Sequence, residues 1–165
     1  MKTIIFIRHA KSSWNNPALN DFERPLNKRG LRDAPFMATL LKAKDIKIDQ
    51  FIASPANRAL TTATYFAKEY GQTQSDIIQQ KEIYHAHPQE VLDIVYQIDN
   101  RIQCACIFGH NPSFTSIANI FSSEYIPNLP TCGIVVVESD ISEWKDINRN
   151  NSELKAFYFP KQYFD

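Results

Sequence analysis

The chain has no long apolar run, and this absence excludes one class of proteins. No stretch of its 165 residues approaches the roughly 20 consecutive apolar residues that a membrane-spanning helix needs. The amino terminus, Met1-Lys2-Thr3-Ile4, also lacks the extended apolar stretch and small-residue cleavage site of a secretory signal. We therefore expect no membrane partner and a cytoplasmic location.

An excess of charge of either sign is also absent. Eighteen basic and eighteen acidic residues give a formal net charge of zero. No overall field would therefore attract nucleic acid, which is not expected as a partner. Any site for an anion has to be a local cluster of cationic side chains.

Cysteine is scarce, with only Cys104, Cys106 and Cys132 in the whole chain. The odd number argues against a disulfide framework, and Cys104 and Cys106 share one face of an apolar run. The chain also lacks two matched Cys or His pairs at the spacing of a structural zinc site. We expect three reduced core cysteines, no metal and no cofactor.

What is present suffices for one hydrophobic core. Hydrophobic residues make up 44% of the chain and charged residues 22%, which is ordinary for a globular protein. A chain of 165 residues fits one domain that needs neither disulfides nor metal. No large insertion interrupts its pattern. The sequence predicts a single domain over residues 1–165 without a cap insertion.

Strand-like and helix-like patterns alternate along the chain. Apolar or β-branched runs of strand length occur at 3–7, 48–53, 77–80, 104–108, 132–138 and 153–159. Apolar residues at helical spacing occur at 28–43, 56–70, 88–100 and 113–121. This alternation predicts an α/β fold with three α/β/α layers, in which helices cover both faces of a mostly parallel central sheet.

Three further features are expected from local patterns. Asn27 is a plausible N-cap for the helix at 28–43. The buried stripe of that helix is predicted to be Leu31, Ala34, Met37, Ala38 and Leu41. Residues 11–21 form a polar loop over the carboxyl ends of the strands, and residues 140–151 form a polar turn region.

Cationic side chains follow three of the predicted strands. Arg8-His9 ends the first strand, Arg58 falls in the first turn of the helix at 56–70, and His110 follows the strand at 104–108. The carboxyl ends of parallel strands meet at one edge of a sheet, where ligands bind. Each residue alone fits an exposed surface cation. Together, Arg8, His9, Arg58 and His110 predict a pocket for phosphate or carboxylate.

These residues occur in an order that resembles the histidine phosphatase superfamily. The resemblance rests on Arg8-His9, Arg24-Pro25-Leu26 with Gly30, Ser54-Pro55 with Arg58-Ala59 and Thr62-Ala63, and Gly109-His110. Short length, the lack of a cap and the stretch Gly109-His-Asn-Pro-Ser113 make the chain similar to SixA-type phosphohistidine phosphatases, which implies a phosphoglycerate mutase-like fold. One departure is Ala10, where the family usually has glycine. Its methyl group is expected to shift a tight turn slightly.

The resemblance implies a role for each cationic residue. His9 would attack phosphorus as a neutral imidazole and form a phosphohistidine intermediate that water then hydrolyses. Arg8, Arg58 and His110 would hold the phosphoryl oxygens, with Arg24 reaching in from the loop. The expected catalysis needs no metal.

The group that protonates the leaving group is open between Glu82 and His85. Glu82 is the best carboxylate by its order in the chain, and an imidazole such as that of His85 is a common proton donor. Both also fit ordinary surface residues, as does Lys11, which would otherwise add a charge for substrate binding. A site with a poor acid suits the P–N bond of phosphohistidine, which breaks more readily than an alkyl phosphate ester.

The sequence therefore predicts a phosphohydrolase with a phosphate-bearing substrate such as a phosphohistidine protein. Two alternatives stay open. A phosphatase or mutase for a small phosphorylated metabolite would use the same pocket but would add a cap or specificity loop. A non-catalytic phosphate-binding module would keep the arginines, and His9 would not be labelled by a phosphoryl donor.

Overall fold

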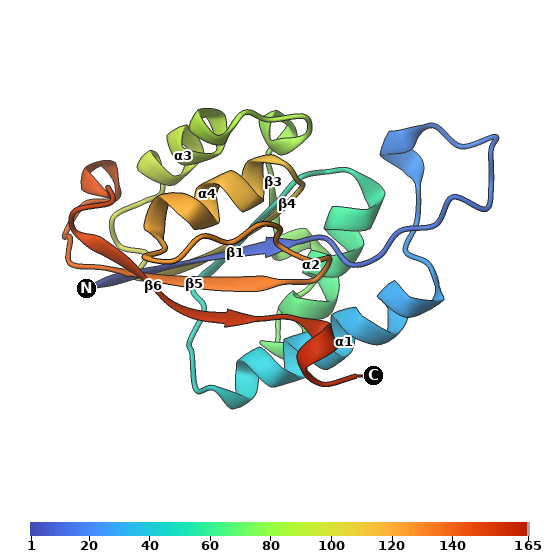
Figure 1. Cartoon of the computed structure of the whole chain (residues 1–165), viewed down its shortest axis with the longest axis horizontal. Helices are drawn as coiled ribbons and strands as arrows, with labels where there is room; N and C mark the ends of the chain where they lie inside the picture. Colours follow the sequence, from blue (N-terminus) through green and yellow to red (C-terminus); the bar gives the residue numbers. More distant parts are fainter. Residues whose placement is uncertain (165) are drawn as a thin grey trace.

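Strand β1 (Lys2–Arg8) lies inside a six-stranded sheet in the computed structural model, which describes residues 1–164. The strand order is β3-β2-β4-β1-β5-β6. The first four of these strands are parallel, β5 is antiparallel to β1, and β6 is antiparallel to β5, so β6 runs in the direction of β1. The other strands are β2 (Gln50–Ala53), β3 (Ile78–Gln79), β4 (Cys104–Gly109), β5 (Ile134–Ser139) and β6 (Ser152–Tyr158). The mostly parallel sheet that the sequence predicts is confirmed (Figure 1).

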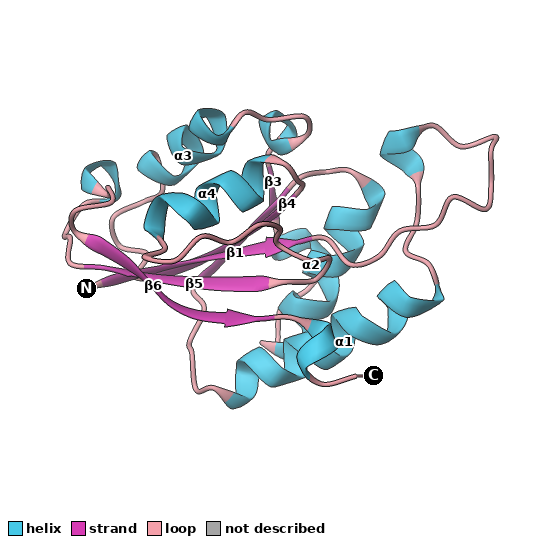
Figure 2. Ribbon diagram, viewed as in Figure 1, coloured by secondary structure: helices cyan, strands magenta, loops and turns pink. Residues whose placement is uncertain are grey.

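Two helices cover each face of the sheet, as Figure 2 shows. The helices are α1 (Lys28–Ala43), α2 (Asn57–Glu69), α3 (Pro88–Tyr96) and α4 (Ser113–Phe121). Successive side chains of a strand point to opposite faces. Ile4 and Phe6 accordingly pack with α3 and α4, whereas Ile5 and Ile7 pack with α1 and α2. The expected α/β/α layers are confirmed.

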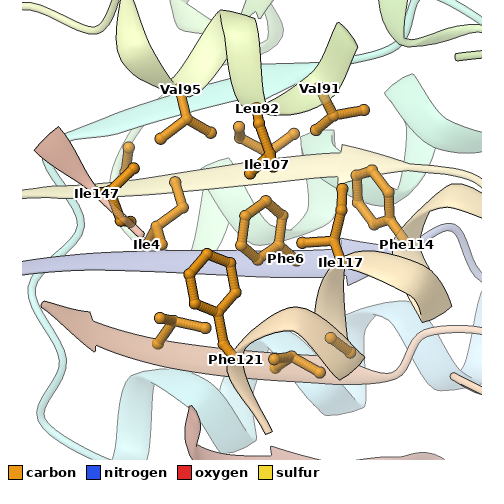
Figure 3. Close-up of a cluster of buried hydrophobic side chains, with 14 of the residues drawn as sticks. Ile4, Phe6, Val91, Leu92, Val95, Ile107, Phe114, Ile117, Phe121 and Ile147 are labelled. Atoms are coloured by element: carbon orange, nitrogen blue, oxygen red, sulfur yellow. The ribbon is translucent and has the colours of Figure 1, made fainter. Parts of the chain in front are cut away.

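The core on the α3 and α4 side is built around Phe6 (Figure 3). Its ring meets Phe114 edge-on, with ring centroids 5.8 Å apart, and stacks near Phe121 at 6.5 Å. Burial of each such side chain stabilises the fold by about 2 kcal/mol. This packing holds β1 in place in the sheet. Arg8 and His9 at its carboxyl end therefore extend from a firmly packed strand.

Several predicted boundaries are confirmed and others are wrong. Helices α1 and α4 have the predicted bounds, and Asn27 caps α1 by accepting a hydrogen bond from the Gly30 N–H at 2.9 Å. Helix α3 ends at Tyr96 rather than at residue 100. Leu31 was expected in the buried stripe of α1 but is 49% exposed. The region 140–151 is not only a polar turn, because Trp144 is fully buried there and its Nε1–H donates to the Ile102 carbonyl at 3.0 Å.

The loop after His9 is anchored to the start of α1. The Asn27 N–H donates to the Lys11 carbonyl at 2.9 Å. A Cβ at Gly30 would overlap that same carbonyl oxygen, so only glycine lets the helix approach this closely. In Figure 1 the rest of the loop, through residue 27, projects beyond the carboxyl end of β1. Gly30 therefore allows the loop after His9 to pack directly against the first turn of α1.

The cysteines lie in the core, as predicted. Cys104, Cys106 and Cys132 are buried and not disulfide-bonded. Burial raises the pKa of the Cys104 thiol to about 12, so it is protonated and unreactive at neutral pH. Among residues 1–164, no helix combines the length and apolarity that a bilayer crossing requires. The same residues contain no group of three or more His, Cys, Asp or Glu arranged to hold a metal ion.

Candidate active site

His9 and His110 follow neighbouring parallel strands that are in register. Arg8 of β1 lies opposite Gly109 of β4, and the His9 N–H donates to the Gly109 carbonyl at 3.0 Å. The two imidazole ring centroids are 5.2 Å apart. Each histidine is only 8% exposed. The predicted meeting of the two strand ends thus places two buried imidazoles side by side.

The backbone next to His9 determines which ring nitrogen is free. Nδ1 of His9 lies 2.7 Å from the carbonyl oxygen of Ala10. A carbonyl oxygen can only accept, so Nδ1 carries the proton and donates it. Nε2 is left with its lone pair. This is the arrangement that a nucleophilic imidazole needs.

Ser54 holds the ring of His110. The Ser54 N–H donates to the Phe108 carbonyl at 3.0 Å, which places the residue directly after β2. Its Oγ lies 2.8 Å from Nε2 of His110 and accepts the Ala56 N–H at 3.2 Å. Nδ1 of His110 is buried and has no hydrogen-bond partner within residues 1–164. That nitrogen is therefore available to a ligand.

Arg58 enters the site from the first turn of α2. Its guanidinium donates to the Asp21 carbonyl oxygen at 2.6 Å through Nη1 and to Oδ2 of Asp21 at 2.9 Å through Nη2. Arg24 donates to Oδ1 of Asp21 at 2.8 Å, and the Tyr84 hydroxyl donates to Oδ2 at 2.6 Å. Arg24 also hydrogen-bonds to Ser12 Oγ. One carboxylate thus holds two guanidinium groups from the loop and from α2.

Asp21 stays ionised in this arrangement. Partial burial opposes its charge, but the hydrogen bonds from Tyr84, Arg24 and Arg58 and the charge of Arg58 outweigh burial and hold the pKa of Asp21 well below its ordinary value. An ionised carboxylate cannot donate a proton to a leaving group at neutral pH. The structure therefore gives Asp21 the role of positioning the two arginines.

Arg8, which directly precedes His9, is held by a different segment of the chain from Arg58. Its Nη1 donates to the Leu129 carbonyl at 3.0 Å, and its Nε is buried without a hydrogen-bond partner among residues 1–164. Arg8 and Arg58 both act on His9 by their charge. The predicted convergence of Arg8, His9, Arg58 and His110 is what the structure contains.

Both imidazoles are neutral at physiological pH. Burial and the charges of Arg58, Arg8 and Arg24 lower the pKa of His9 to about 3, although its hydrogen bond to the Ala10 carbonyl opposes this. Burial, together with the charges of His9 and Arg58, lowers the pKa of His110 to about 3 as well. His9 is thus kept in the uncharged form that can attack phosphorus.

Acidification is expected to destabilise the fold through these two histidines. Their folded pKa of about 3 lies below the ordinary 6.5, so only the unfolded chain takes up protons between these values. The stabilisation is complete above pH 6.5 and declines by about 1.4 kcal/mol per pH unit for each histidine. Urea unfolding across this range is expected to show a shallower pH dependence for His110→Asn. Equal slopes for variant and wild type would contradict the buried neutral imidazole.

Ala10 adopts a conformation that does not need glycine. Among residues 1–164, the non-glycine residues with positive φ are Asp45, His85 and Cys132. Ala10 is fully buried, and its N–H donates to Oγ1 of Thr62 at 3.0 Å. The methyl group of Ala10, which stands where the family usually has glycine, is therefore accommodated in the core beside α2.

The remaining predicted residues lie in three different places. His85 is exposed and lines a cavity of about 430 Å³ together with Asp21, Arg58 and His110. Lys11 is exposed and lines a separate cavity that it shares with Arg8.

Glu82 does not reach this site. It was expected at a strand end, but it is exposed on the short 3-10 helix Lys81–Ile83 and lines a different cavity with Gln80 and Glu90. The reason is that β3 is only two residues long and Ile83 takes the buried position of the turn. Sequence reasoning missed Asp21 and Tyr84, and it named Ser54 in the motif Ser54-Pro55 without giving it a role. The Asp21-x-x-Arg24 spacing is the one local signal that pointed to a contact.

Replacement of Glu82 by glutamine is expected to leave catalysis within about twofold of wild type. An exposed carboxylate outside the cavity cannot protonate a leaving group there. The test is kcat measured on an alkyl phosphate and on a phosphoramidate. A loss confined to the alkyl phosphate would instead restore Glu82 as the acid.

Comparisons with known proteins agree with this geometry. Residues 4–86 match the family model of the histidine phosphatase superfamily (branch 1). An uncharacterised protein from Mycobacterium leprae is 26% identical over 167 residues, which cover 94% of this chain and 100% of that protein.

Solved structures share the fold. A protein assigned as phosphohistidine phosphatase SixA from Agrobacterium tumefaciens has a TM-score of 0.80 and 24% identity, covering 96% of this chain and 98% of its own. A protein histidine phosphatase SixA complexed with tungstate also has a TM-score of 0.80, with 19% identity and coverage of 97% and 98%. These likenesses confirm the fold that the resemblance implied.

Proposed function

This chain belongs to the histidine phosphatase superfamily, and from that premise we propose that it is a metal-independent phosphohydrolase acting on protein phosphohistidine. The observation that carries the proposal is the pair of buried imidazoles, with ring centroids 5.2 Å apart, of which His9 lies within reach of the charges of Arg8 and Arg58. Such a site offers a nucleophile and fixed positive charge in one place.

The reaction has two steps on His9. The unphosphorylated ring nitrogen of the substrate phosphohistidine first takes a proton from solvent. Nε2 of His9 then attacks phosphorus while the P–N bond breaks, and the substrate histidine leaves as a neutral imidazole. Water then attacks the phosphoryl group on Nε2, which releases inorganic phosphate and restores neutral His9. Arg8, Arg58 and the Nδ1–H of His110, whose Nε2 accepts from the Ser54 hydroxyl, stabilise the charge that spreads over the phosphoryl oxygens.

Among residues 1–164, the site offers no carboxylic acid, and its remaining candidate acid is the exposed imidazole of His85, which suits a phosphoramidate better than an alkyl phosphate. Asp21 is the one carboxylate among the described residues lining the cavity with Arg58 and His110, and its lowered pKa keeps it ionised. An alkoxide leaving group needs a proton donor with a pKa near the working pH. The second ring nitrogen of a phosphohistidine can take its proton from solvent, so the imidazole leaves as a neutral group without a carboxylic acid in the site.

A substrate panel tests the proposal. Hydrolysis rates are measured for a phosphohistidine protein, a phosphoramidate and common sugar phosphates, in the presence of a metal chelator. We expect kcat/KM for the phosphohistidine protein to exceed that for the sugar phosphates by at least about a hundredfold. A preference for sugar phosphates would favour a phosphatase for small metabolites. Absence of turnover on every substrate would favour a phosphate-binding module.

A further inference from the structure

A second cavity borders the active site, and most of its charged side chains are cationic. It has a volume of about 350 Å³ and lies between the start of α1 and the carboxyl-terminal 3-10 helix Pro160–Gln162. Its cationic residues are Arg8, Lys11, Arg29, Arg32 and Lys161, and its one carboxylate is Asp33. The whole chain has a net charge of zero, so this is a local concentration of positive charge.

The buried carboxylate of Asp33 forms ion pairs with two of these cations, Arg29 and Arg32. Its side chain is fully buried, whereas the side chains of Arg29 and Arg32 are 47% and 48% exposed. Nε of Arg32 donates to Oδ1 of Asp33 at 3.0 Å, and its Nη2 lies 2.8 Å from the same oxygen. Nε of Arg29 lies 3.6 Å from Oδ2. The Arg32 guanidinium also stacks 4.0 Å from the ring of Phe164. One buried carboxylate cannot neutralise two guanidinium groups, so positive charge remains toward the cavity.

Arg8 connects this cavity to the catalytic histidines. It lines the cavity, and it directly precedes His9. Its guanidinium shares the Leu129 carbonyl with Nδ2 of Asn111, which donates at 3.1 Å and which lines the cavity containing His110. Arg8 therefore lies at the border between the site of His9 and the second cavity.

We propose that this cavity binds a second anionic group of the substrate, namely carboxylate side chains next to the phosphohistidine of the substrate protein. This inference rests on the proposed function for the identity of the substrate. Guanidinium groups held by Asp33 offer paired N–H donors to a carboxylate without losing side-chain freedom on binding. The walls formed by Phe159 and Pro160 match the aliphatic part of glutamate side chains. The cavity thus selects acidic sequences around the phosphorylated histidine.

The test uses two phosphohistidine peptides that differ only in having glutamate or glutamine beside the phosphohistidine. Their kcat/KM values are measured for wild type, for Lys161→Glu and for the control Lys47→Glu. Both lysines are exposed. Lys47 precedes β2 and so lies near the amino-terminal ends of the parallel strands, away from the site. Wild type is expected to prefer the acidic peptide by about tenfold, the usual strength of two exposed ion pairs. Lys161→Glu is expected to abolish the preference, and Lys47→Glu to keep it.

The outcomes separate this inference from the proposed function. Equal kcat/KM for the two peptides in wild type overturns the second anion site while leaving the phosphatase intact. An equal loss of preference in both lysine variants also overturns it, because the effect would then be one of net charge. If neither peptide is hydrolysed but phenyl phosphate is, the protein substrate is wrong, and 4-carboxyphenyl phosphate against phenyl phosphate tests the cavity. If wild type prefers 4-carboxyphenyl phosphate and Lys161→Glu loses this preference, the cavity binds the carboxylate of a small-molecule substrate. If wild type shows no preference, the second anion site is overturned.

Discussion

Replacement of His9 by alanine is expected to remove phosphatase activity by at least about a thousandfold, because no other group can form the covalent intermediate. The fold is expected to survive, since the side-chain hydrogen bond of His9 runs only to the adjacent residue Ala10. Binding of vanadate is expected to remain, because Arg8 and Arg58 still provide positive charge. Activity above a few per cent of wild type would contradict the assignment of the nucleophile.

Labelling with a phosphoryl donor tests the same residue independently of turnover. The chain has four histidines, and the exposed His87 provides a matched control. Wild type and His87→Ala are expected to trap an acid-labile phosphoryl group, and His9→Ala is expected to trap none. Because Nδ1 of His9 donates to the Ala10 carbonyl, the label is expected on Nε2. Phosphorus NMR separates the two isomers, and a label on Nδ1 would show that the ring has to turn before it attacks.

The parts of the fold that could be predicted depend on local patterns. The apolar run of β1, the spacing of α1 behind its Asn27 cap and the apolar face of α4 each appear within one short window of sequence. The meeting of His9 and His110 follows from parallel topology alone, because the carboxyl ends of parallel strands lie at one edge. Sequence reasoning could therefore find the proposed catalytic pair without knowing any side-chain contact.

Contacts that depend on the path of a loop could not be predicted. Asp21 meets Arg58 across 37 positions and Tyr84 across 63 positions of the chain, and no periodicity links such distant residues. Glu82 illustrates the opposite error. Its position in the chain order suggested a role, but the short edge strand β3 and the buried Ile83 turn its side chain away from the site. The order of the elements along the chain thus predicts which strand ends lie near the site. The contacts between side chains depend on the path of the loop, which the sequence pattern does not reveal.

Replacement of Arg58 by alanine is expected to lower kcat/KM by about a hundredfold to a thousandfold, the usual cost of one buried donor to a transition-state oxyanion. Vanadate affinity is expected to fall with it. Stability is expected to change by only about 1 kcal/mol, because the Asp21 side chain is 39% exposed and keeps its hydrogen bonds from Arg24 and Tyr84. Vanadate titration and thermal unfolding of the variant measure the two effects. Unchanged vanadate affinity would contradict the role of Arg58 in holding the phosphoryl group.

Three further variants separate charge from geometry at this position. Arg58→Lys keeps the charge but cannot form the paired contacts to Asp21, so it is expected to recover only part of the lost activity. Asp21→Asn leaves Arg58 in the chain but removes the anion that holds it, so kcat is expected to fall although the phosphate-binding charges remain. Arg101→Ala removes an arginine that is 90% exposed and precedes the amino end of β4, so it controls for net charge. A full recovery by Arg58→Lys would mean that the paired contacts to Asp21 are not needed to place the charge at position 58.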